Sequence, residues 1–117
     1  MKRSFSIAFV LALLVAAPLS AESVDGVLMD VMCSGKFAAK GYDGSLPHTK
    51  MCALMDNCKA SGFVIIQKDG KVVKLDANGN ELAIKALEAT SKNDTLTVAA
   101  EGKLDGDTLA VSSLKIT

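Results

Sequence analysis

The sequence predicts a small α+β domain that is mainly β, with short helices and five strands closed into a barrel. Three observations indicate it. Aliphatic runs of strand length recur along the chain, two pairs of them are separated by Asp-Gly, and only two segments have helical periodicity. The chain has no Trp and only four Phe. Aliphatic side chains must therefore fill most of the core, and a deep aromatic ligand pocket is not expected.

The first 21 residues have the three parts of a cleavable secretory signal peptide. Lys2 and Arg3 form a positive end, an apolar run covers residues 7–17, and Ala21 offers a small residue at the cut. The apolar run is shorter than the roughly 20 residues of a membrane span, so an uncleaved anchor is the weaker alternative. We expect cleavage near Ala21 and a mature chain of residues 22–117 in the periplasm or outside the cell.

The charge of this mature chain argues against two classes of partner. Residues 22–117 contain eleven Lys, thirteen acidic residues and no Arg, a formal net charge of −2. Arg supplies the bidentate contacts that bind phosphate and read guanine, so nucleic acid is not an expected partner. No polybasic segment is present to bind an anionic membrane, and no later segment is apolar for long enough to insert stably in one.

The first half of the mature chain predicts a strand followed by an insertion. Alternating apolar residues predict a strand over residues 22–33, with a bulge or entry turn at Asp25-Gly26. Several Gly and a Pro predict a loop over residues 34–47. Apolar residues at helical spacing predict a short helix over residues 48–60 that stops near Gly62.

The second half predicts two hairpins separated by a helix. Residues 63–67 and 71–75 flank Asp69-Gly70, a strong hairpin signal. Asn78-Gly79 predicts a turn, and a short amphipathic helix follows from residue 82 to about residue 90. The last hairpin has its strands at 95–104 and 108–116 around Asp105-Gly106, with an irregularity at Ser112-Ser113.

Without the insertion, the predicted order is β-β-β-α-β-β, which is the chain order of an OB-fold, a small five-stranded barrel. A different α+β sheet covered by two helices is the alternative. Ninety-six residues make a single domain. We therefore expect one OB-like domain over residues 22–117, with a Cys/His insertion at residues 33–60.

The residues able to do chemistry are concentrated in that insertion. All three cysteines and the only histidine lie within 26 residues, as Cys33, His48, Cys52 and Cys58. In an OB-like barrel the insertion would be the loop between the first two strands, which is one of the ligand-binding loops of that fold.

One interpretation of the cluster is a disulfide. Exported proteins oxidise their cysteines, and one such bond stabilises a domain by about 2–4 kcal/mol. Cys52 and Cys58 would lie on different faces of a continuous helix, so Cys33 paired with either of them is the expected bond. The third thiol would then be left for a redox reaction, or for a bond to a partner protein or a second copy.

The other interpretation is a metal site. Three thiolates and one imidazole are a complete set for tetrahedral zinc, and a closed site of this kind would be structural. Thioethers extend the set toward copper, because thiolates and thioethers select Cu(I). The methionines concerned are Met29, Met32, Met51 and Met55. Methionines at helical spacing are, however, more common in cores than in metal sites.

Asp30 and the enzyme motifs add little to these two interpretations. Asp30 is expected on the solvent face of the first strand, and a hydrogen bond to His48 is the alternative. Cys-x-x-Cys, Cys-x-x-Cys-His and the nucleophile elbow are all absent from the sequence. The chain is therefore not expected to be an enzyme.

Several of these features together resemble a known group. Gly26-Val-Leu-Met-Asp30-x2-Cys33 is followed by His48, Cys52 and Cys58, then by Gly62-Phe-Val-Ile-Ile and Asp69-Gly70-Lys71-Val72. This run resembles small exported bacterial proteins of uncharacterised function, in which a D-x2-C…H…C…C insertion precedes an OB-like barrel. The resemblance covers most of residues 24–116, and the His-to-Cys and Cys-to-Cys gaps of that group are shorter. A looser similarity is to the bacterial OB-fold family of exported stress-linked proteins, which lack this cysteine set.

The sequence thus predicts an exported, non-enzymatic binding module. The Cys33, His48, Cys52 and Cys58 cluster would bind zinc or copper, or would act as a disulfide-braced loop for a small ligand. A periplasmic thiol or redox protein that uses its unpaired cysteine is one alternative, and a structural envelope protein is the other.

Overall fold

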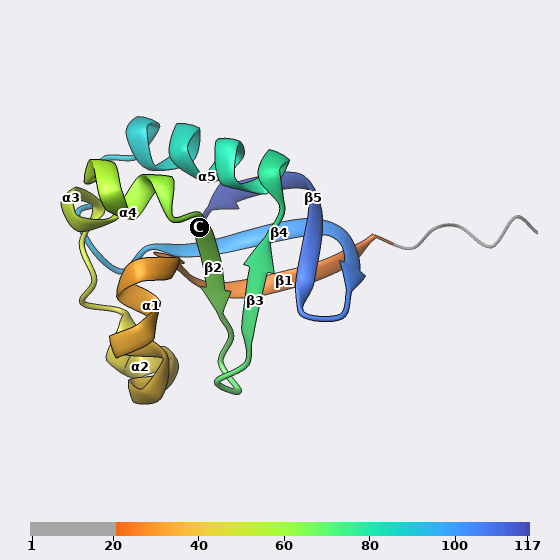
Figure 1. Ribbon diagram of the computed structural model, residues 1–117, viewed down its shortest axis with the longest axis horizontal. Helices are drawn as coiled ribbons and strands as arrows, with labels where there is room; N and C mark the ends of the chain where they lie inside the picture. The colour runs from red at the N-terminus through yellow and green to blue at the C-terminus, as the bar shows by residue number, and fades with distance from the viewer. Residues whose placement is uncertain (1–20) are drawn as a thin grey trace, which may run out of the picture.

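The computed structural model describes residues 21–117, and the predicted signal peptide lies outside these residues except for Ala21 (Figure 1). Five strands form one sheet that closes in a ring in the order β1-β2-β3-β5-β4. All neighbouring strands are antiparallel except β3 and β5, which are parallel. The strands are β1 (Glu22–Asp30), β2 (Phe63–Ile66), β3 (Val72–Leu75), β4 (Thr97–Asp105) and β5 (Thr108–Ile116). This confirms the α+β class and the five closed strands.

Strand β1 closes the ring because it pairs with two neighbours in turn. The residues from Glu22 to Val27 pair with β4, and the residues from Val27 to Asp30 pair with β2. Gly26 lies at the crossing, where a Cβ atom would be 2.3 Å from the carbonyl oxygen of Ile66. The register with β4 is continuous through this point, so the predicted irregularity at Asp25-Gly26 is wrong. The close approach of two strands, rather than a bulge, requires the glycine.

Both Asp-Gly hairpins are confirmed. Gly70 and Gly106 have positive φ angles of 87° and 62°, which glycine adopts without strain. The irregularity predicted at Ser112-Ser113 is also confirmed. Glu101 pairs with Ser113 and Gly102 pairs with Val111, so Ser112 is an extra residue in β5.

The insertion between β1 and β2 is mostly helical, and helices or a 3-10 turn cover residues 31–45, so the loop predicted over residues 34–47 is wrong. It contains α1 (Val31–Phe37), a 3-10 turn (Ala38–Lys40), α2 (Gly41–Ser45), α3 (Lys50–Ala53) and α4 (Asp56–Ala60). The single helix predicted over residues 48–60 is divided in two, because Met55 has an extended conformation with ψ of 141°. In Figure 1 these helices gather at one end of the sheet.

Helix α5 (Ala77–Ala89) begins five residues earlier than predicted, and Asn78-Gly79 belongs to its first turn. Asp76 causes this, because its Oδ1 atom accepts a hydrogen bond from the Gly79 N–H at 2.9 Å and caps the helix. A Cβ atom at Gly79 would lie 2.5 Å from a methyl group of Val111. The glycine therefore allows α5 to pack closely on β5.

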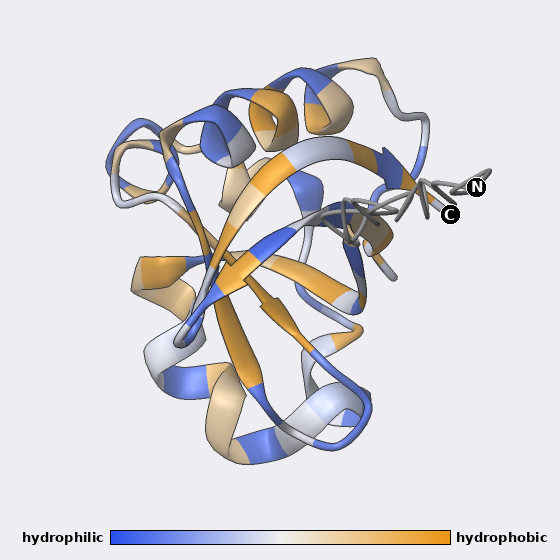
Figure 2. Cartoon of the chain, turned by 90° about the vertical axis from the view of Figure 1, so that its right-hand side faces the viewer, coloured by the Kyte–Doolittle hydropathy of each residue, from blue (hydrophilic) through white to orange (hydrophobic). Residues whose placement is uncertain are grey.

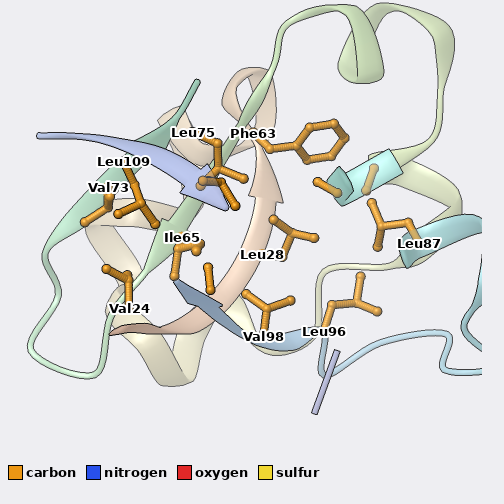
Figure 3. Close-up of a cluster of buried hydrophobic side chains, with 14 residues drawn as sticks. Val24, Leu28, Phe63, Ile65, Val73, Leu75, Leu87, Leu96, Val98 and Leu109 are labelled. Atoms are coloured by element: carbon orange, nitrogen blue, oxygen red, sulfur yellow. The ribbon is translucent and has the colours of Figure 1, made fainter. Parts of the chain in front are cut away.

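The main core lies inside the ring, between the strands and α5 (Figure 3). Figure 2 shows the apolar residues concentrated on the strands, while the helices alternate between apolar and polar residues. A second, smaller cluster contains Met29, Val64 and Ile66, with Cys33 and Phe37 of the insertion packed against it. The insertion thus covers the outer face of β1 and β2, and the end of β1 is buried on both sides.

Candidate metal centre

Three potential metal ligands meet where the insertion leaves and rejoins the closed sheet. Asp30 is the last residue of β1, Cys33 lies in the first turn of α1, and Cys58 lies in α4. One carboxylate oxygen of Asp30 and the two Sγ atoms all lie within 4.8 Å of one another. Carboxylates, thiolates and imidazoles are the side chains that bind zinc in proteins.

Backbone hydrogen bonds hold the two cysteine-bearing helices together. The Val31 N–H donates to the Gly62 carbonyl at 2.9 Å, and the Met32 N–H donates to Oγ of Ser61 at 3.2 Å. The Ser61 hydroxyl in turn donates to the carbonyl of Cys58. The start of α1 is therefore fixed against the end of α4, and this places Cys33 beside Cys58 although 24 residues separate them in the sequence.

Asp30 is positioned by its role as the N-cap of α1. Its Oδ2 atom accepts a hydrogen bond from the Cys33 N–H at 2.9 Å. The side chain is fully buried, because the insertion folds over the end of β1. The expectation that Asp30 lies on the solvent face is therefore wrong. The alternative was a hydrogen bond from His48, and the structure brings the two side chains together without a hydrogen bond of good geometry.

His48 lies on the other side of this carboxylate. Its Nε2 atom is 3.2 Å from Oδ1 of Asp30, and its ring packs edge-on against Phe37 with 5.4 Å between centroids. Both side chains are almost fully buried. Within residues 21–117, Oδ1 of Asp30 and both ring nitrogens of His48 lack a hydrogen-bond partner of good geometry. Such buried polar atoms are rare in native proteins and often mark the place of an ion, a water molecule or a functional group.

The electrostatics of the centre keep its thiols protonated when no cation is bound. Burial, the nearby Asp30 carboxylate and the Cys58 thiol, in decreasing order of effect, together raise the pKa of Cys33 to about 12. The pKa of Cys58 is also raised, first by burial and then by Asp30. A bound cation would reverse this preference, because it stabilises the thiolate form.

The imidazole of His48 is held in its neutral form. Burial lowers its pKa, and the Asp30 carboxylate opposes this only in part. A neutral imidazole is able either to bind a metal ion or to donate one hydrogen bond to a carboxylate. His48 is therefore in the correct state to orient Asp30 or to join the ligand set.

The structure thus brings together three of the four residues that the sequence singled out, and adds Asp30. Cys33 and Cys58 share the centre, and His48 contacts its carboxylate. Cys52 lies on α3, partly exposed and outside the group of ligands within 4.8 Å. The signal for Asp30 was its spacing, since Asp three residues before a helical N–H is typical of an N-cap.

All three cysteines carry free thiols in this structure. Cys33 and Cys58 have the neighbouring Sγ atoms, and they are one of the two pairs expected from the sequence. Among residues 21–117, no helix is both long enough and apolar enough to cross a membrane. The chain was compared with protein-family models, with curated proteins and with solved structures, and none of them matches it.

Proposed function

We propose that this chain is an exported metal-binding module with an OB-like barrel, and that it binds Zn²⁺ at Asp30, Cys33 and Cys58. The observation that carries the proposal is the convergence of these three donors beside buried polar atoms that lack partners. The strand order of the closed ring, with α5 between β3 and β4, supports an OB-like barrel. The leader-like residues 2–21 support export.

Zinc fits this ligand set better than copper does. Two thiols supply soft donors, but the third donor is a carboxylate, which is a hard oxygen ligand. Zn²⁺ accepts sulfur, nitrogen and oxygen ligands in one tetrahedral site, whereas Cu(I) selects sulfur. In the proposed site His48 orients Asp30 through the 3.2 Å contact, as outer partners of metal ligands commonly do.

The proposed role is binding rather than catalysis. Asp30, His48 and Cys58 are buried and Cys33 is partly exposed. Such a buried centre suits a small ion better than a larger substrate. Loss of the two thiol protons on binding would make the affinity increase with pH.

Thiol–disulfide exchange is the second candidate, because the thiols of Cys33 and Cys58 are neighbours. It is the weaker one, since reactive thiols have lowered pKa values and those of Cys33 and Cys58 are raised. The Asp30 carboxylate raises the pKa of both thiols, so it would slow attack by either of them.

Zinc titration of the reduced protein against a chromogenic chelator tests the proposal. We expect one Zn²⁺ per chain, and at least about tenfold weaker binding in Asp30→Asn and Cys58→Ser, because each removes a charged ligand. Asp56→Asn and Cys52→Ser are the matched controls, with the same chemical changes outside the centre. Equal affinity in all five proteins, or no bound zinc in the wild type, would overturn the proposal.

A further inference from the structure

A groove crosses the surface between α2, the turn that joins β2 to β3, and the place where β4 begins and β5 ends. Its first part is lined by Lys40–Asp43 of the insertion and by Lys68 of the turn. Tyr42 and Lys68 also line its second part, which continues over β1 and β4 to Lys115 of β5. The second part has a volume of about 410 Å³, within the roughly 300–1,000 Å³ of small-molecule sites. The two parts form one groove, with Tyr42 and Lys68 at its middle.

Hydrogen bonds within both walls of this groove fix its shape. In α2, the buried Ser45 hydroxyl donates to the Gly41 carbonyl at 2.7 Å and holds the helical turn that contains Tyr42. In the turn between β2 and β3, the Gln67 N–H donates to the Lys71 carbonyl at 2.8 Å. The groove is therefore preformed, so a ligand would not have to order either wall.

The groove combines one aromatic ring with a nearly balanced set of charges. Tyr42 is the only tyrosine in the chain, and the Nζ atom of Lys68 lies 6.0 Å from the centroid of its ring. The charged side chains that line the two parts are Lys40, Lys68, Lys115, Asp25 and Asp43. Three lysines and two aspartates leave a net charge of only +1. None of the five forms an ion pair with another residue of the range 21–117, so all are free to bond a ligand.

This composition argues against a polyanionic ligand. A phosphate-rich chain is bound by an excess of cations, and above all by arginine, whereas this groove has two carboxylates and no arginine. A purely apolar ligand is also a poor fit, because it would take charged groups out of water without giving them a partner.

A sugar has the properties that the groove requires. The C–H face of a sugar ring is apolar and packs on an aromatic ring, and each of its hydroxyls both donates and accepts hydrogen bonds. A lysine only donates and an ionised aspartate only accepts, so a surface with both satisfies hydroxyls in either direction.

We propose that this groove binds a neutral saccharide chain, with Tyr42 packed on one sugar ring and with Lys68 and Asp25 bonded to its hydroxyls. The inference does not rest on the proposed metal-binding function, because none of the three metal ligands lines the groove. A chain of several sugars suits it better than a single sugar, because the groove continues on both sides of Tyr42.

Tyrosine fluorescence of the full protein tests the groove directly. The chain has no Trp and Tyr42 is its only Tyr, so the emission reports this one position. We expect a saturable change in emission with chitotetraose or cellotetraose, which are neutral probes. No saturable change with either probe would overturn the proposal. Tighter binding of acidic tetragalacturonate or of a thymidine octanucleotide would also overturn it, because the groove would then select anions.

Calorimetric titration of variants with the same neutral probes assigns the binding to residues. We expect the affinity to fall at least about fivefold in Tyr42→Leu, which removes the ring, and to stay within about twofold in Tyr42→Phe, which keeps it. Lys68→Ala should also weaken binding by at least about fivefold, because it removes a charged hydrogen-bond donor. The matched control is Lys85→Ala, which changes an exposed lysine of α5 outside the groove.

The urea midpoint of unfolding shows whether each of these variants retains the fold, and binding is compared among the folded ones. Wild-type affinity in Tyr42→Leu would contradict the proposal. An equal loss of affinity in Lys68→Ala and Lys85→Ala would contradict it as well, because general charge, and not the groove, would then control binding.

Discussion

The Nε2 atom of His48 lies 3.2 Å from Oδ1 of Asp30, and both side chains are buried beneath the helical insertion. The same carboxylate accepts the Cys33 N–H through its other oxygen. Asp30 therefore connects the histidine, the first turn of α1 and the two thiols of the centre. This carboxylate, which belongs to β1, organises side chains that all come from the insertion.

Replacement of His48 by glutamine tests whether the histidine orients the carboxylate. We expect zinc affinity to fall by about 10- to 100-fold, the usual cost of losing an outer partner of a ligand. The intensity of the thiolate-to-Co²⁺ absorption in the cobalt-loaded variant should stay the same, since both cysteines remain. Wild-type affinity in His48→Gln would show that the contact with Asp30 does not support metal binding.

The metal-free protein should be most stable between about pH 6.5 and 9. Burial lowers the pKa of folded His48 below its ordinary value of 6.5, so its contribution is present above that pH and is lost as pH falls through the lowered value. The pKa of Cys33 is raised from 9.0 to about 12, so its contribution is present below pH 9 and is lost toward pH 12. Urea unfolding at pH 5, 7.5 and 10 measures the free energy of unfolding on both sides of this range.

Two variants test which residue causes the loss of stability at low pH and which causes it at high pH. His48→Gln should weaken the loss of stability at pH 5, and Cys33→Ser should weaken the loss at pH 10. If the wild type and both variants lose stability in parallel with pH, other groups control the pH dependence.

Mild oxidation of the metal-free protein should join Cys33 to Cys58 and leave Cys52 free for alkylation, because the first two have neighbouring Sγ atoms. Peptide mapping by mass spectrometry identifies the bond. Zinc should protect the pair, since its thiolates would then be metal-bound. A bond that contains Cys52 would show instead that α3 and α4 rearrange on oxidation.

Gly26→Ala should destabilise the fold by about 1–3 kcal/mol, because its Cβ would lie 2.3 Å from the Ile66 carbonyl oxygen where β1 closes the ring. Gly35→Ala is the matched control. It lies within α1 with no atom within 4 Å of a Cβ, and alanine favours a helix by about 0.5–1 kcal/mol. The urea midpoints of unfolding of the two variants and the wild type measure these effects. A Gly26→Ala variant with the wild-type midpoint would exclude the close strand crossing.

The strands of the closed sheet could be predicted because their signals are local. Asp69-Gly70 and Asp105-Gly106 define the two hairpins, and aliphatic runs on either side define the strands. The insertion could not be predicted in the same way. Its helices are short and interrupted at Gly41 and Met55, so they depend on contacts with β1 and β2 that no local pattern encodes.

The candidate site could likewise be predicted only in part, because its residues have a local sequence signal but their arrangement does not. Clustering in the sequence singled out the cysteines and His48, but their grouping depends on how the insertion folds. The extended residue Met55 separates α3 from α4, which directs Cys58 into the centre and leaves the partly exposed Cys52 outside it. Asp30 was expected on the solvent face because the apolar Met29 beside it suggested that the opposite face is the buried one. In the structure Asp30 shares its face with Val24 and Leu28, which line the main core, and it is fully buried.

X-ray absorption spectroscopy at the zinc edge of the loaded wild-type protein tests the central claim most directly. A centre of Asp30, Cys33 and Cys58 predicts two sulfur neighbours at about 2.3 Å, with the remaining neighbours oxygen or nitrogen at about 2.0–2.2 Å. The same spectrum is expected for Cys52→Ser, which removes a cysteine outside the centre. Three sulfur neighbours in the wild type, falling to two in Cys52→Ser, would contradict the account.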